Sequence, residues 1–195
     1  MRDQCLNQLV KNVLFAVQKP VAKVRLAKLT YFVFKDLVRN QSVPAQELAF
    51  IRMPLGPVPD GFMQELADDK EISIEVSEVG LLYNKESYSL TDSKSITQLS
   101  YLPAIHQRLR ILNQYPTSTL VELSHQDYSW LNHANGDRYF LLSEDLQKGE
   151  SFAHSPKMAD ISVTMDNQLL QSKLVNGMVD EMVKDNTDLE YARGS

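Results

Sequence analysis

The sequence predicts a mainly α protein with a small antiparallel β-hairpin, an α+β fold in one domain that is followed by a C-terminal amphipathic helix. Along most of the chain, apolar residues recur at three- and four-residue steps, the period of a helix buried on one side. Between positions 72 and 90 the period changes to two, which is typical of half-buried strands. With 195 residues, 43% of them hydrophobic, the chain can bury one core of ordinary size.

The first two predicted helices differ in how much of their surface is apolar. Positions 6–17 carry one apolar face, with Asp3 available as an N-cap and Pro20 as the stop. From position 21 to 39 apolar residues cover almost the whole circumference, which predicts a central helix. Its basic residues fall on one narrow stripe, which we expect to be a wet edge of that helix. The stripe consists of Arg25, Lys28, Lys35 and Arg39.

The middle of the chain predicts a turn, a short helix and a hairpin. Three prolines and a glycine between positions 54 and 60 indicate a rigid turn that cannot donate to a central sheet. Pro57 or Pro59 then suits the first position of a short helix that runs to about residue 67. Positions 72–76 alternate as a strand, and 81–83 with 88–90 predict a hairpin around a turn at 84–87.

Helical periodicity returns in the second half. A helix is expected to begin near Pro103 and to end at Pro116, and Thr117 or Ser118 can cap a short helix after it. We expect a domain over residues 1–147, a linker over 148–164, an amphipathic helix over 165–185 and a disordered tail over 186–195. The apolar ridge of the amphipathic helix recurs every four residues: Leu170, Leu174, Met178 and Met182.

Composition narrows the class of protein. No apolar run approaches the roughly 20 residues that span a bilayer, and the first residues lack the apolar stretch of a signal peptide. The single cysteine, Cys5, can form no internal disulfide, which indicates a reducing compartment. A net charge of -5 disfavours nucleic acid as a partner. We therefore expect a cytoplasmic protein without membrane contact.

The search for catalytic motifs finds one weak candidate. His125 and His133, with Asp127 between them, could begin a metal site or the acid/base site of a hydrolase-type enzyme. The alternative, which we prefer, is that His125 bonds a helix end and that Trp130 buries its ring while its indole N–H finds an acceptor. We expect no catalytic residue, no metal and no cofactor.

Three short motifs occur in a fixed order along the chain. They are Lys28-Leu29-x-Tyr31-Phe32, then Gly56-Pro57-Val58, then Leu123-x-His125 followed by Trp130. This ordered set resembles the Panacea domain, the family typified by SocA-type antitoxins, and the resemblance covers roughly residues 5 to 146. Each motif residue also has a plain structural interpretation as part of the core or of a turn.

The resemblance implies a function that composition alone does not give. It implies a non-catalytic antitoxin, bacterial or from a prophage, that binds and neutralises a cognate protein toxin. In the SocA-like branch it implies a proteolytic adaptor that delivers the toxin to an AAA+ protease, and a homo-oligomer stays open. The chain departs from simple family members by lacking an evident helix-turn-helix and by carrying the segment after residue 164. The basic stripe and the C-terminal ridge are the candidate contacts for a partner.

Overall fold

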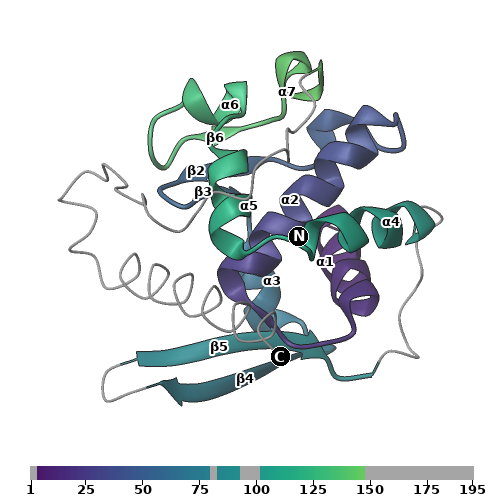
Figure 1. The fold of residues 1–195 in the computed structure, drawn as a ribbon, viewed down its shortest axis with the longest axis vertical. Helices are drawn as coiled ribbons and strands as arrows, with labels where there is room; N and C mark the ends of the chain where they lie inside the picture. Colours follow the sequence, from purple (N-terminus) through teal and green to yellow (C-terminus); the bar gives the residue numbers. More distant parts are fainter. Residues whose placement is uncertain (1–3, 80–82, 93–101, 148–195) are drawn as a thin grey trace.

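The computed structural model describes residues 4–79, 83–92 and 102–147, and it confirms a mainly helical α+β fold. Seven α-helices and two three-stranded antiparallel sheets make up these ranges (Figure 1). The predicted linker, C-terminal helix and tail, residues 148–195, lie outside the described residues. No helix within the described ranges is both long and apolar enough to cross a membrane.

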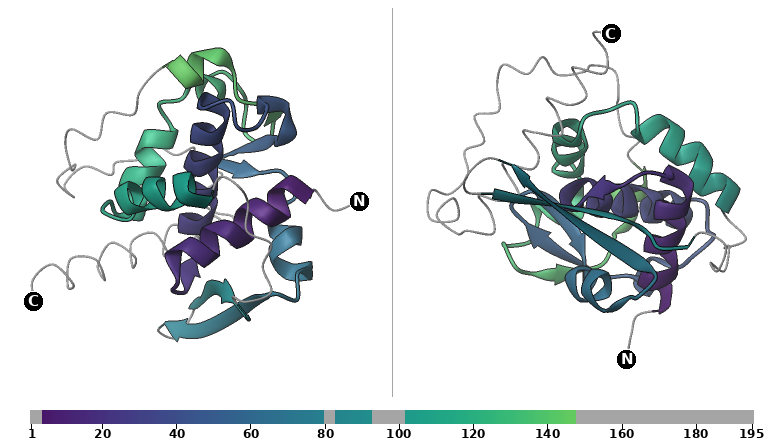
Figure 2. Two further views of the ribbon diagram at one scale, coloured as in Figure 1. Left: turned by 90° about the vertical axis from the view of Figure 1, so that its right-hand side faces the viewer. Right: turned by 90° about the horizontal axis from the view of Figure 1, so that it is seen from below.

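Helix α2, Lys23–Arg39, is the centre of the fold. Helices α1 (Gln4–Val17), α4 (Leu102–Leu112) and α5 (Thr117–Ser124) pack around it, and strand β3 covers a further side (Figures 1 and 2). The prediction of a central helix is confirmed, but the helix begins at Lys23 and not at residue 21, because Val21 and Ala22 pair with another strand. The fully buried side chains that α2 supplies to the core are Leu26, Leu29, Tyr31, Phe32 and Phe34.

One sheet has the strand order β1-β5-β4. Its strands are β1 (Val21–Ala22), β5 (Tyr83–Leu90) and β4 (Ile72–Val79). A hairpin is present, but it is not the predicted one, because residues 83 and 88–90 belong to the same strand, β5, whose hairpin partner is β4. Residues 84–87 lie inside β5, paired with β4 in a register that begins with Ile72 opposite Leu90, and the connection falls on residues 80–82, outside the described ranges. Lys85, Glu86 and Ser87 are half-buried and residues 74–77 of the paired strand are exposed, so polar side chains are tolerated in this ribbon and resemble a turn in the sequence.

The second sheet was not predicted. Its order is β3-β2-β6, with β2 (Phe50–Met53), β3 (Gly56–Pro59) and β6 (Arg138–Tyr139). The predicted rigid turn is therefore mostly a strand. Its prolines are tolerated because β3 is an edge strand, where a missing N–H costs no ladder bond on the outer side. The helix that follows, α3 (Phe62–Asp68), starts after Gly61 and not at Pro57 or Pro59.

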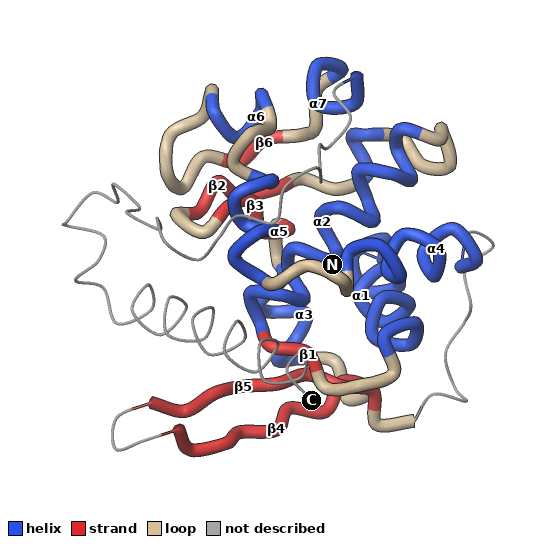
Figure 3. Tube along the Cα trace, viewed as in Figure 1, coloured by secondary structure: helices blue, strands red, loops and turns tan. Residues whose placement is uncertain are grey.

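The remaining helices complete the described chain. The helix predicted near Pro103 is α4, but it ends at Leu112 and not at Pro116, which caps the next helix, α5. The predicted side-chain cap on α5 is wrong, because Pro116 occupies the cap position and Thr117 is already the first helical residue, without a capping bond. The short helices are η1 (Ala45–Glu47), α6 (Tyr128–Leu131) and α7 (Ser143–Gln147). Figure 3 shows β6, α6 and α7 at the opposite end of the molecule from β4 and β5.

Candidate functional site

The first two sequence motifs meet where α2 passes beneath β3. The Lys28 ammonium is buried and donates a hydrogen bond to the Pro57 carbonyl, with 2.7 Å between Nζ and O. Gly56 has a φ of +91°, and a Cβ at this position would lie 2.3 Å from Ser124 Oγ. Only glycine allows both this backbone conformation and this close approach. Lys28, Gly56 and Ser124 thus form one tightly packed junction between α2, β3 and α5.

The third motif closes the junction through a stack of side chains. The rings of His125 and Trp130 are parallel within 13°, with their centroids 4.0 Å apart. On Trp130 the Arg52 guanidinium lies 4.1 Å from the ring centroid, a cation–π contact. The indole Nε1 donates to the Met53 carbonyl at 3.2 Å, which confirms the expected acceptor for Trp130. His125 occupies the C-cap of α5, as expected for a residue at a helix end.

Burial decides the protonation of the two titratable groups of this junction. Desolvation lowers the pKa of Lys28 to about 7. Desolvation, with the positive charges of Lys28 and Arg52, lowers the pKa of His125 to about 4. At neutral pH His125 is therefore uncharged, and Lys28 is divided between its charged and neutral forms.

A second buried group of polar residues joins α2 to α6. The Asp127 carboxylate accepts hydrogen bonds from the Tyr31 hydroxyl and from Lys35, whose Nζ lies 2.6 Å from Oδ1. Burial raises the pKa of Asp127, while the Lys35 charge opposes that shift. Burial and the Asp127 charge raise the pKa of Tyr31. Lys35 and Asp127 thus form a buried ion pair between the first and third motifs.

Asp145 holds α7 against α6 in a similar way. Its carboxylate accepts the Ser129 N–H at 3.0 Å and the Leu142 N–H at 2.9 Å, and the Ser129 hydroxyl also donates to it. Asp145 is itself buried. The short helices of this end of the molecule are therefore fixed by buried carboxylates as well as by apolar packing.

The predicted wet basic stripe is wrong for three of its four members. Arg25, Lys28 and Lys35 are buried, and they face neighbouring elements of the same chain. The Arg25 guanidinium donates to the Tyr115 carbonyl at 3.0 Å. Arg39 alone is half exposed, and it bonds the Leu146 carbonyl at 3.1 Å. Arg25, Lys28 and Lys35 lie where α2 contacts the elements around it, because these elements cover most of the central helix.

The two histidines lie in separate aromatic stacks. The His133 ring stacks on Tyr139 with 4.8 Å between centroids, and its Nδ1 lies 2.6 Å from the Ser129 carbonyl oxygen. The His125 ring stacks on Trp130 as described above. Across the ranges that the structure describes, no group of three His, Cys, Asp or Glu side chains is placed to hold a metal ion. The contacts of the two imidazoles therefore give no support to a joint site.

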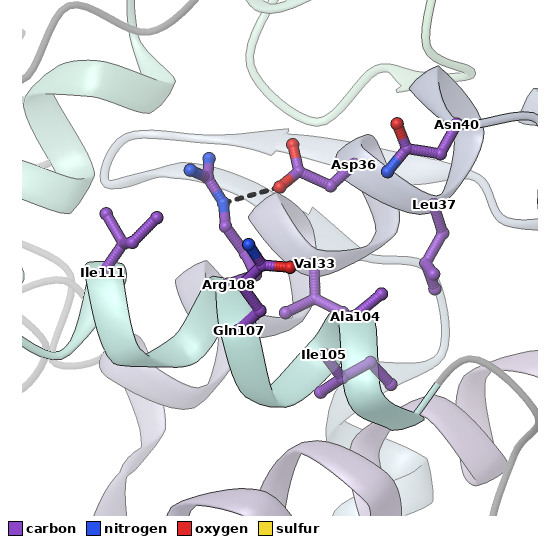
Figure 4. Close-up of a pocket in the computed structure, with 9 residues that line it drawn as sticks. All are labelled: Val33, Asp36, Leu37, Asn40, Ala104, Ile105, Gln107, Arg108 and Ile111. Carbon is purple, nitrogen blue, oxygen red and sulfur yellow. Dashed lines mark ion pairs between the residues drawn. The ribbon is translucent and has the colours of Figure 1, made fainter.

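An open groove lies between the C-terminal half of α2 and α4 (Figure 4). Its volume of about 230 Å³ is below the roughly 300–1,000 Å³ of typical small-molecule sites. Arg108 and Asp36 form an ion pair at its edge, with 2.8 Å between Nε and Oδ2. The lining residues of the groove are Val33, Asp36, Leu37, Asn40, Ala104, Ile105, Gln107, Arg108 and Ile111.

Sequence reasoning missed the partners that make the motifs a unit. Asp127 was considered as an acid or base, whereas the structure uses it as the counter-ion of Lys35. Arg52 and Ser124 were not singled out. The signal that could have found Asp127 is the basic stripe itself, because lysines on an otherwise apolar helix require buried acceptors. The C-terminal ridge, Leu170 to Met182, lies outside the described residues.

The fold and the junction define a class: a mainly helical α+β protein whose three sequence motifs meet in one polar junction, buried at Lys28 and Gly56 and half-buried at His125 and Trp130. Comparison of the chain with protein-family models, with curated proteins and with solved structures finds no match.

Proposed function

We propose that this protein is a non-catalytic antitoxin that binds and neutralises a cognate protein toxin in the bacterial cytoplasm. The observation that supports the proposal is the convergence of the three motifs in space. Lys28, Gly56 and His125 are separated by up to about a hundred residues of sequence, yet they belong to one junction. Motifs that lie together in space are what the resemblance to Panacea-domain antitoxins would require of a shared fold, and their convergence supports the proposal for that reason.

The accessible features favour binding over turnover. The motif side chains are used in packing and in bonds to backbone carbonyls, as for Lys28 on Pro57 and Trp130 on Met53. The concavity between α2 and α4 combines an apolar floor with one ion pair, which suits a protein side chain. Exposed apolar side chains also gather around α6, at Tyr128, Leu131 and Leu142. Exposed apolar side chains that lie close together are a feature of surfaces that contact other proteins, which supports the proposal.

The test is co-expression with the product of the neighbouring reading frame. We expect that product to arrest growth when expressed alone, and growth to resume when this chain is present. A stable complex of the two proteins on size exclusion would support direct neutralisation. Toxin that disappears only in cells with an intact AAA+ protease would instead make the chain a proteolytic adaptor. Growth arrest that this chain does not relieve would refute both.

A further inference from the structure

Strand β4 forms the outer edge of its sheet. The order β1-β5-β4 places β5 on one side of β4, and no strand in the described ranges pairs with its other side. Figures 1 and 2 show β4 and β5 as a long ribbon at one end of the molecule. β4 is eight residues long, and alternate residues along it present their backbone groups at this edge.

The register identifies the backbone groups that face outward. The Thr91 N–H donates to the Glu71 carbonyl at 2.9 Å, so this position is a hydrogen-bonded one of the β4–β5 ladder. Bonded and non-bonded positions alternate along an antiparallel pair. Glu75, four residues further on, therefore bonds β5, whereas Ile74 and Val76 direct their N–H and C=O groups to the outer edge.

The side chains at this edge are apolar on one face and acidic on the other. Ile74 is 43% exposed and Val76 is 59% exposed, although both are β-branched residues suited to a sheet. Glu75, between them, is exposed on the opposite face. Natural edge strands are commonly protected by lysine or proline, and β4 contains neither.

We propose that the outer edge of β4 is a docking edge, to which an extended basic segment of a partner protein adds as a further strand. The added strand bonds the outward N–H and C=O groups of Ile74 and Val76, which gives affinity. Its apolar side chains lie beside Ile74 and Val76, and a lysine or arginine lies beside Glu75. The inference rests on the proposed function for the class of partner, the toxin.

Charge favours such a partner over a second copy of this chain. The symmetric pairing that places Ile74 beside Val76 of the copy also places the two Glu75 side chains directly opposite each other. Like charges in that position destabilise a sheet, and each chain already carries a net charge of -5. A strand that carries a lysine or arginine opposite Glu75 forms an attractive charge pair at the same position.

A short synthetic peptide tests the edge without the toxin. The probe is acetyl-Thr-Val-Lys-Val-Thr-amide, titrated into the full-length ¹⁵N-labelled chain and followed by amide chemical shifts. We expect the Ile74 and Val76 amides to move most. Val76→Pro removes an outward N–H without removing a bond to β5, so peptide affinity should fall about tenfold or more. Val76→Thr keeps both the N–H and the branched shape, and should bind nearly as the wild type does.

Charge reversal provides a second, independent arm. A second peptide has glutamate in place of the lysine. The wild type should bind the lysine peptide more tightly than the glutamate peptide, and Glu75→Lys should bind the glutamate peptide more tightly than the lysine peptide. Equal binding of both peptides by the wild type and by Glu75→Lys would overturn the proposal. Concentration-dependent dimerisation that Val76→Pro abolishes would overturn it in favour of a second copy.

The toxin experiment separates this inference from the proposed function. Val76→Pro should lose neutralisation in co-expressing cells while Val76→Thr retains it. Neutralisation that survives Val76→Pro would refute the docking edge and leave the antitoxin function standing. Peptide binding at β4 together with a neighbouring product that this chain never neutralises would refute the function and leave the edge standing.

Discussion

Replacing Lys28 with methionine should remove a pH dependence from the stability of this protein. Methionine keeps the length and apolar stem of the side chain and removes the amine. The pKa of Lys28 falls from 10.5 to about 7 in the folded state because of burial. A difference of this size corresponds to about 4 or 5 kcal/mol of unfavourable free energy when the folded protein must hold the charged form. Lys28→Met removes this cost, but it also loses the hydrogen bond to the Pro57 carbonyl, which offsets about 1–3 kcal/mol of the gain in stability.

The sign follows from proton counting. Between pH 7 and 10.5 the unfolded chain carries a proton on Lys28 that the folded protein does not, so the free energy of unfolding rises with pH. From pH 7 to pH 10 this group should add about 3 to 4 kcal/mol to wild-type stability. Lys28→Met should lack this rise. The variant is therefore expected to be the more stable protein at pH 7 and to lose that advantage by pH 10.

Urea unfolding at pH 7, 8, 9 and 10 measures the effect, followed by the fluorescence of Trp130, the single tryptophan. Lys70→Met is the matched control, because Lys70 is exposed and its replacement removes the same charge without the burial. Its stability should follow the wild-type curve. Curves for wild type and Lys28→Met that stay parallel within about 0.5 kcal/mol would show that Lys28 is not desolvated as described.

Three further perturbations address the junction, the ion pair and the C-terminal segment. Gly56→Ala should cost about 3–5 kcal/mol in urea unfolding, from a strained φ and a collision with Ser124 Oγ. Adding Ser124→Ala should recover about 1 kcal/mol or more, and no recovery would contradict the close approach. Asp127→Asn should lower the free energy of unfolding by about 3–5 kcal/mol, because it leaves Lys35 buried without a counter-charge. Adding Lys35→Met to this variant should recover part of the loss. Losses that are strictly additive would refute the pairing. Deleting residues 166–195 should leave a cooperatively melting domain that no longer neutralises toxin in the co-expression assay. Aggregation of the shortened protein would indicate that the C-terminal ridge belongs to the core. Full neutralisation by the shortened protein would show that the ridge is not needed for the function.

The sequence predicted correctly those helices whose position is determined by residues within the helix or directly beside it. The central helix was evident from its apolar circumference, and Pro20 and Pro116 lie at the boundaries that proline chemistry requires. The predictions that failed depend on neighbours distant in sequence. The strand at Gly56–Pro59 exists because β2 pairs with one side of it, and the polar run at 84–87 is a strand because β4 pairs with it.

The candidate site was predicted in its residues but not in its arrangement. The motif positions Lys28, Gly56 and His125 were singled out, yet nothing in their spacing shows that they meet. The basic stripe was interpreted as a surface because charge on a helix is usually solvated. A row of basic residues has the same sequence pattern whether it is buried against neighbouring elements or faces solvent. The two cases are distinguished only by the positions of their partners, here Asp127 and the carbonyl groups around α2.

The buried cations of α2 also set the order in which the protein can fold. Lys35 finds its carboxylate 92 residues later in the chain, Tyr31 bonds the same carboxylate across 96 residues, and Arg25 reaches Thr117 across 92. A growing chain that ends before residue 127 lacks the carboxylate that Lys35 and Tyr31 bond, so this part of the central helix must stay partly solvated until Asp127 is made. Closure of the core waits for the last third of the domain, and fragments that contain only the first half should remain unfolded targets for proteases.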